Sequence, residues 1–266
     1  NPLEEKSIYN QILKKKIKIV FFDIKKNYGK GFLTKIKKNG TKLITIDDAY
    51  KKRNYCDICF YPPVPQVKKL KWENNQSKKY IGWKYIPIQN EYNFKIKKYK
   101  ISNKVLIIGG GSNYNNFIGK ILKKLNTFKN RLDIVIPFGY GYNKNSSISK
   151  TISLSKHNIS FLSKKLTMTK IMLRSHVIIM PYGISCFESI LLKKSSIILA
   201  RNKDDYQSAS IFRKYGLSVI LKTINDLDES IYTNFLRRKK NKNVNKISSY
   251  LKRGSSNIAK IINETK

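Results

Sequence analysis

Short β-branched runs alternate with stretches of helical periodicity along nearly the whole chain, and this alternation limits the folds available to it. Runs such as 105–108 and 177–180 are apolar throughout, and each is followed by turn residues and then by a helix-like pattern. Buried strands joined by helices form βαβ units, which build mostly parallel sheets. We therefore predict an α/β fold in which helices cover parallel sheets.

The predicted elements fall into two series, separated by a hinge near 97–103. The first series has strands at 16–22, 42–46 and 57–60, a helix at 29–38 that Asn39-Gly40 ends, and a polar loop at 68–79. The second series has strands at 105–108, 133–137, 158–162, 177–180, 196–200 and 217–221, and helices at 116–126, 168–175, 185–193 and 206–215. Helices at 227–236 and 244–262 follow. We expect domains at 1–100 and 101–225, and C-terminal helices at 226–266.

Length and cysteine content favour a soluble cytoplasmic protein. The chain has 266 residues, 41% of them hydrophobic, which is enough to bury a good core. No apolar run approaches the roughly 18 residues that a membrane span needs. Residues 1–15 show no signal-peptide pattern, and the chain starts at Asn1, so the numbering begins inside a longer chain or the start was trimmed. An odd number of cysteines, three, argues against a disulfide framework.

The strong positive charge alone would suggest a nucleic-acid partner. There are 55 Lys and Arg residues against 16 Asp and Glu residues, which gives a net charge of +39. These cations are scattered through every segment, whereas a dedicated binder concentrates them on one face or in a tail. The one compact run is 237–240. We expect nonspecific attraction to anions that fades with salt, and we keep a nucleic-acid module as a minor alternative.

A first glycine turn, Gly109-Gly-Gly-Ser-Asn113, lies between a predicted strand and a predicted helix. The amides and the dipole at the start of that helix would favour an anion such as a phosphate. The turn is neither a spaced dinucleotide fingerprint nor a P-loop. A tight turn that needs glycine for its backbone conformation alone remains an equal alternative.

A second glycine turn follows the strand at 177–180 and contains Gly183, Ser185 and Glu188. Glycine lets a ligand approach the backbone, Ser185 would cap the helix or hold a phosphate oxygen, and Glu188 could accept hydrogen bonds from a ribose diol. Alternatively, Ser185 and Glu188 form a capping box. Both glycine turns follow strands of one domain, at the sheet edge where open α/β sheets bind ligands. We therefore predict one shared anion site.

Other reactive side chains give weaker signals. Cys56 and Cys59 have no second cysteine pair, and the two histidines, His157 and His176, are isolated, so we expect no metal site and no cofactor. We interpret both histidines as core or surface residues. Asp47-Asp48 follows a strand and is expected to cap the next turn, although it could bind a cation. No complete catalytic set is visible.

The order of these motifs resembles a known family, the UDP-sugar hydrolases of pseudaminic acid biosynthesis, which are related to GT-B glycosyltransferases. The resemblance covers roughly 16–222 and rests on short motifs: Ile46-Asp-Asp48, Cys56-Asp57, the segment 81–92, the segment 105–116, the segment 168–188, and Tyr206-Gln207 leading to Gly216. It implies a GT-B fold of two Rossmann-like domains facing across a cleft. The first domain would be the acceptor-binding and catalytic domain, and the second would bind a UDP-sugar.

The resemblance also implies roles for particular residues at the nucleotide. Gly110, Gly111, Ser112 and Asn113 would lie over the diphosphate, which Gly183 and Ser185 would flank. The loop 165–168, with Thr167 and Met168, would face the uracil. Glu188 would hold the ribose, and Gln207 would approach the phosphate or the sugar.

Departures from the family pattern limit what the resemblance implies about activity. Family members open with a strand and a glycine-rich loop carrying a histidine, whereas this chain begins at what resembles their second βα unit, so that histidine has no counterpart. The family's Gly-x-Pro is replaced by 193–195, its Asn-Gln pair by Tyr206-Gln207, and an expected aromatic residue by Lys25. We expect a monomer that releases UDP from an amino-sugar nucleotide in surface-polysaccharide synthesis. The alternatives are a GT-B glycosyltransferase and a non-catalytic UDP-sugar-binding remnant.

Overall fold

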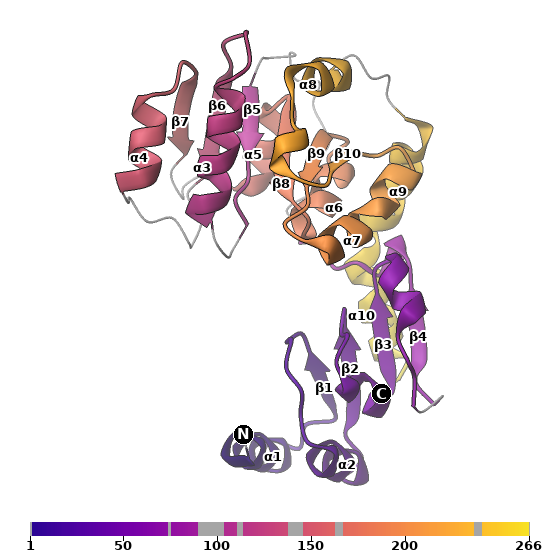
Figure 1. The fold of residues 1–266 in the computed structure, drawn as a ribbon. Helices are drawn as coiled ribbons and strands as arrows, with labels where there is room; N and C mark the ends of the chain where they lie inside the picture. The colour runs from indigo at the N-terminus through magenta and orange to yellow at the C-terminus, as the bar shows by residue number, and fades with distance from the viewer. Residues whose placement is uncertain are drawn as a thin grey trace. The chain divides into compact units, whose positions relative to one another are not determined.

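The chain forms two compact units, each built around a parallel sheet (Figure 1). The computed structural model describes residues 2–73, 76–89, 104–110, 114–137, 146–162, 167–236 and 241–265. The first unit comprises Asn1–Pro87 and Arg253–Lys266, and the second comprises Ile88–Lys252. The predicted α/β class with two Rossmann-like parallel sheets is confirmed.

In the first unit, four parallel strands lie side by side in the order β1-β2-β3-β4. The strands are β1 (Ile19–Phe22), β2 (Lys42–Ile46), β3 (Ile58–Tyr61) and β4 (Lys78–Ile81). The α-helices are α1 (Pro2–Lys14), α2 (Lys30–Lys38) and α10 (Gly254–Asn263), and the 3-10 helices are η1 (Lys51–Tyr55), η2 (Pro65–Lys69) and η3 (Trp83–Tyr85).

The last helix, α10, belongs to the core of the first unit. Alternate strand residues share a face of a sheet, and Ile44, Ile58 and Phe60 form one buried cluster with Ile258 of α10. The side-chain amide of Asn257 also donates a hydrogen bond to the carbonyl oxygen of Lys84, at 3.0 Å. The first unit is therefore completed by residues that follow the entire second unit in the sequence.

In the second unit, six parallel strands lie in the order β10-β9-β8-β5-β6-β7. The strands are β5 (Lys104–Ile107), β6 (Asp133–Pro137), β7 (Asn158–Leu162), β8 (Val177–Pro181), β9 (Ser195–Leu199) and β10 (Val219–Leu221). The helices are α3 (Tyr114–Leu125), α4 (Ser146–Ser153), α5 (Met168–Arg174), α6 (Ile184–Leu191), α7 (Lys203–Lys214), η5 (Ile224–Asp226), α8 (Glu229–Leu236) and α9 (Lys242–Lys252).

One face of the larger sheet is sealed by apolar side chains of α3 and α8. Val105, Val177 and Ile197 from three neighbouring strands form a single buried cluster with Ile121 of α3 and Phe235 of α8. Each large aliphatic or aromatic side chain removed from water contributes about 1.5–3 kcal/mol. This cluster fixes the strands whose ends form the candidate site.

Several sequence predictions are confirmed, and the exceptions have physical reasons. Helix α2 ends at Asn39-Gly40, where Gly40 has φ of +77°, and α7 ends before Gly216, where φ is +64°. The predicted helix at 244–262 is two helices, α9 and α10, because the chain passes from one unit to the other between them. The predicted loop at 68–79 contains the start of the short edge strand β4. We did not predict α1 or α4, and of the α1 residues only Ile12 is buried.

No helix in the described part of the chain is both long enough and apolar enough to cross a membrane. The three cysteines, Cys56, Cys59 and Cys186, are free and buried, as the odd number led us to expect.

We predict that Gly254→Ala destabilises the first unit. A Cβ atom at this position would lie 2.0 Å from the carbonyl oxygen of Ile86 and 3.0 Å from its carbonyl carbon, so the start of α10 would have to move. Overpacking of this kind costs about 1–3 kcal/mol. Urea unfolding followed by tryptophan fluorescence measures the effect, because both tryptophans, Trp72 and Trp83, lie in this unit.

The matched control is Gly31→Ala in α2, where an added Cβ meets no atom within 4 Å. Alanine is the better helix former by about 1 kcal/mol, so this variant should be as stable as the parent chain or more stable. Equal unfolding midpoints for the two variants would show that α10 does not dock on Ile86 as described.

Candidate functional site

The strand order of the second unit reverses between β5 and β8. From β5 the sheet continues through β6 to β7, and from β8 it continues the other way through β9 to β10 (Figure 1). In open parallel sheets, ligands bind outside the carboxyl ends of the strands at such a reversal, because the connecting helices leave on opposite faces there. The strands that flank this reversal are the ones that lead into the two glycine turns.

The two glycine turns lie next to each other at this edge. Beyond the paired strands, the amide of Ile108 donates a hydrogen bond to the carbonyl oxygen of Ile179, at 2.9 Å. Gly110 has φ of +75°, and a Cβ atom there would lie 3.2 Å from Cγ of Pro181, the residue that begins the second turn. The remaining predicted residues of the first turn, Gly111, Ser112 and Asn113, lie outside the described residues.

The second turn leads directly into α6. Gly183 is the N-cap residue, in an extended conformation and without a side-chain cap. Ser185 is the second residue of the helix, so the capping box with Glu188 that we considered is wrong. The first amides of a helix have no intrahelical acceptor and carry the positive end of its dipole, so the start of α6 is suited to an anion. Glu188 lies one turn into the helix and is buried.

Cys186, in the first turn of α6, is a structural residue. Its Sγ donates a hydrogen bond to the carbonyl oxygen of Pro181, at 3.4 Å. Burial raises the pKa of the Cys186 thiol to about 12, which keeps it protonated at neutral pH. It is therefore not a candidate nucleophile.

An arginine that we did not predict joins the second turn to α7. The guanidinium of Arg201, just after β9, donates to the carbonyl oxygen of Tyr182 at 3.2 Å, and its Nε lies 2.7 Å from Oδ2 of Asp205. Asn202 caps α7 by accepting from the amide of Asp205, at 2.8 Å. Gln207 follows in the next turn of α7 and is half-buried. The only signal for Arg201 in the sequence is a basic residue directly after a buried strand.

Thr167 and Met168 stand at the start of α5. The hydroxyl oxygen of Thr167 accepts from the amide of Lys170, at 3.5 Å, and so caps this helix. Because α5 connects the parallel strands β7 and β8, its start lies at the carboxyl edge of the sheet, the edge that also carries the glycine turns. Residues 163–166 lie outside the described residues.

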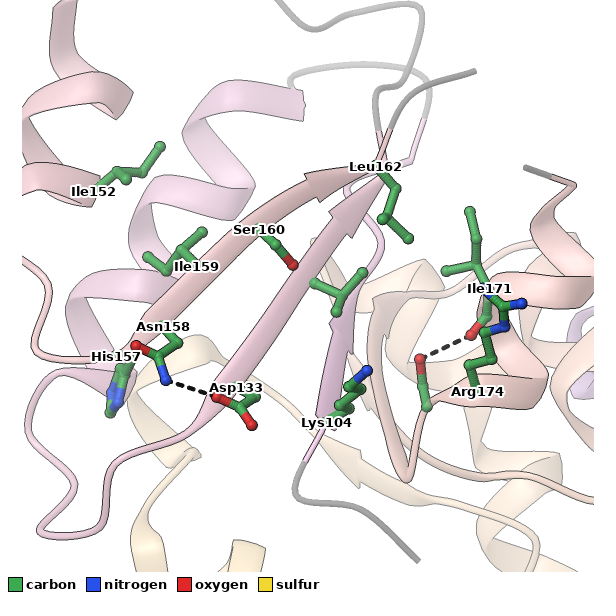
Figure 2. A pocket seen from close by; sticks show the side chains of 12 residues that line it. Lys104, Asp133, Ile152, His157, Asn158, Ile159, Ser160, Leu162, Ile171 and Arg174 are labelled. Carbon is green, nitrogen blue, oxygen red and sulfur yellow. Dashed lines mark hydrogen bonds between the residues drawn. The ribbon is translucent and has the colours of Figure 1, made fainter. Parts of the chain in front are cut away.

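A groove of about 520 Å³ opens at the opposite edge, around the amino ends of β5, β6 and β7 (Figure 2). Lys104, Asp133 and Asn158 begin these strands, and the side-chain amide of Asn158 donates to Oδ1 of Asp133, at 2.9 Å. Arg174 of α5 lines the other side (Figure 2). None of the predicted site residues lines this groove, which extends along β7 as far as Leu162, the last residue of that strand (Figure 2).

The two histidines do not lie at the carboxyl edge. His157 is a buried core residue, as expected: its Nδ1 accepts from the amide of Leu132 at 3.2 Å, and its Nε2 lies 2.8 Å from the carbonyl oxygen of Leu125. His176 precedes β8 and is half-buried at the amino edge, where burial and then Lys194 lower its pKa. Neither histidine is placed to act as a base beside the glycine turns.

Asp48 and Lys52 have a structural role in the first unit. Nζ of the fully buried Lys52 donates to Oδ1 of Asp48 at 2.8 Å and to the carbonyl oxygens of Ile24 and Lys26 at 2.7 and 2.9 Å. Asp48 also accepts from the amide of Tyr50, at 3.1 Å, so it caps the turn after β2 as expected. All three ammonium protons are used, and the ion pair holds together the loops after β1 and β2.

The described residues contain no group of three or more His, Cys, Asp or Glu side chains that could hold a metal ion. The Sγ of Cys56 donates to the carbonyl oxygen of Lys52, at 3.4 Å. The hydrogen bond with Cys59, together with burial, raises the pKa of the Cys56 thiol.

Solved structures of sugar-nucleotide enzymes share this fold. No protein-family model and no curated protein matches the chain by sequence. MurG of Acinetobacter baumannii matches with a TM-score of 0.59 and 11% identity, over 98% of this chain and 77% of MurG. UDP-GlcNAc 2-epimerase of Neisseria meningitidis, bound to UDP-GlcNAc, matches with a TM-score of 0.58 and 15% identity, over 98% of this chain and 80% of the epimerase.

A third match is the spinosyn forosaminyltransferase SpnP, with a TM-score of 0.56 and 9% identity, over 95% of this chain and 75% of that protein. These similarities show the GT-B fold that the motif order implied. They do not support the narrower identification as a pseudaminic acid hydrolase.

Proposed function

We propose that the second unit binds the diphosphate of a UDP-sugar at the carboxyl ends of β5 and β8. The proposal is supported by the closeness of Gly110 to Pro181, because Pro181 leads into the start of α6. Two adjacent turns that present backbone amides can donate hydrogen bonds to the oxygens of a pyrophosphate. The structural neighbours include an epimerase bound to UDP-GlcNAc and a forosaminyltransferase, which supports a nucleotide sugar as the ligand.

In this proposal each segment at the edge has one role. The turn with Gly110, Gly111, Ser112 and Asn113 covers the diphosphate from one side, and Gly183 and Ser185 approach it from the other. Thr167 and Met168 face the uracil, Glu188 accepts hydrogen bonds from the ribose, and Gln207 approaches the phosphate or the sugar. Arg201 holds the second turn in place through the carbonyl oxygen of Tyr182.

The proposed reaction is displacement of UDP from the anomeric carbon of an amino-sugar. The nucleophile forms a bond to that carbon, and the electron pair of the broken bond leaves with the diphosphate, whose growing charge is stabilised by the start of α6. Water as nucleophile gives hydrolysis. An alcohol as nucleophile gives glycosyl transfer, a second candidate that the transferases among the structural neighbours favour.

We predict that Glu188→Ala weakens UDP binding by about 1–3 kcal/mol, because the ribose hydroxyls lose a buried acceptor. Isothermal titration of the full chain with UDP measures the affinity, and Glu264→Ala, an exposed carboxylate in the first unit, is the control. Circular dichroism verifies that each variant is folded. Undiminished affinity in a folded Glu188→Ala variant would remove this residue from the site.

We also predict that Gly110→Ala weakens UDP binding about tenfold, because a non-glycine residue at positive φ costs roughly 1–2 kcal/mol. The added Cβ would also press on Pro181, at 3.2 Å. Gly119→Ala in α3, where nothing lies within 4 Å of an added Cβ, is the matched control. If the two variants bind UDP equally well, the first turn does not contact the nucleotide.

A product assay tests the reaction. With UDP-GlcNAc as the probe, chromatography should detect UDP released in water alone, and Glu188→Ala should slow this release. If UDP is released only after an acceptor sugar is added, the reaction is glycosyl transfer and not hydrolysis. Binding without any release would rule out both reactions for this chain with this probe.

A further inference from the structure

A second groove, of about 660 Å³, runs along α3 in the second unit and is lined by cations. One wall is α3 with Lys120, Lys123 and Lys124, and the other is the segment after β10 with Lys222. The groove ends at Arg201, the residue that also contacts the second glycine turn. Three segments far apart in the sequence thus bring five cationic side chains to one concave surface, and no carboxylate lines it.

The groove is distinguished by five cations that line one concave surface without a carboxylate. Lysines without a carboxylate partner are common in this chain, because 55 Lys and Arg residues face 16 Asp and Glu residues, but a few described lysines do form pairs, such as Lys37 with Asp57 and Lys52 with Asp48. Among the described residues, none of the four groove lysines has a carboxylate oxygen within 4.0 Å. Lysines at spacings of three and four residues share a helix face and repel one another, which destabilises the helix until an anion screens them.

The nearby carboxylates are engaged in local structure. Asp226 accepts from the amide of Thr223, at 2.8 Å, in the capping box of η5. Hydrogen bonds from Ser230 and Ile231 are the main reasons why the pKa of Asp228 is lowered, and Lys124 makes a smaller contribution. Uncharged donors add to the cations of the groove: Asn116, Thr127, Thr223 and Asn225 also line it.

We propose that this groove, which shares Arg201 with the second glycine turn, binds a small soluble oligophosphate beside the proposed nucleotide site. Its volume lies in the range of small-molecule sites, about 300–1,000 Å³. A concave groove does not match the plane of a membrane. The lining offers no exposed aromatic ring on which bases could stack, because Phe117 is buried. The proposal does not depend on the proposed function.

Titration of the full chain with inorganic tripolyphosphate at physiological ionic strength tests the site. In the triple variant Lys120→Gln/Lys123→Gln/Lys124→Gln, affinity should fall by about tenfold or more, the sum expected for three exposed charge contacts. The matched control is Lys242→Gln/Lys246→Gln/Lys252→Gln on α9, which removes the same charge from exposed positions in the same unit. Its affinity should change less than about twofold.

Gly110→Ala separates this site from the nucleotide site, because Gly110 is proposed to lie over the diphosphate of UDP: the variant should weaken UDP binding and leave tripolyphosphate binding unchanged. Equal losses in the two triple variants would show attraction by net charge alone and would overturn the proposal. Tripolyphosphate binding that responds to Gly110→Ala but not to the α3 variant would also overturn it. A different outcome is that the chain binds phosphatidylglycerol vesicles through the three lysines and does not bind tripolyphosphate. That result would overturn the proposal of a soluble ligand and identify a lipid headgroup as the ligand.

Discussion

The pairing of β5 with β8 is the interaction on which the candidate site depends. These strands are far apart in the sequence, but they lie side by side at the one place where the order of the larger sheet reverses. Their pairing brings Gly110 close to Pro181, which leads into the start of α6. The apolar cluster around Val105, Val177 and α3 holds the two strands together. Packing thus fixes the backbone geometry on which the proposed chemistry depends.

The fold class and the bounds of several strands followed from local sequence signals. The bounds predicted for β6 and β7 agree with the structure, because turn and loop residues flank both apolar runs. That both glycine turns share an edge also followed, since parallel strands have their carboxyl ends on one side. The position of each strand within the sheet could not be predicted from local patterns. Arg201 became a candidate only when β9 was seen next to β8, with the guanidinium at the carbonyl oxygen of Tyr182.

Other features could not be read from local patterns because distant contacts create them. The apolar positions of α10 indicated a helix, but only the structure shows that Ile258 packs against Phe60 and belongs to the first unit. Conversely, α1 buries a single residue, Ile12, so its sequence has too weak a periodicity to predict it. Glu5 of α1 nevertheless accepts from the amide of Gly29 at 2.7 Å, at the N-cap of α2.

Amide chemical shifts during a UDP titration show where on the chain the nucleotide binds, because they report on each backbone position separately. If the nucleotide binds where β5 and β8 end, the largest shifts will fall on the amides of Gly110, Gly183, Ile184 and Ser185. The amides of His157 and Asn158, at the opposite edge, will stay nearly unchanged. Shifts centred on the groove at the amino ends of β5, β6 and β7, with the glycine turns unaffected, would contradict the account.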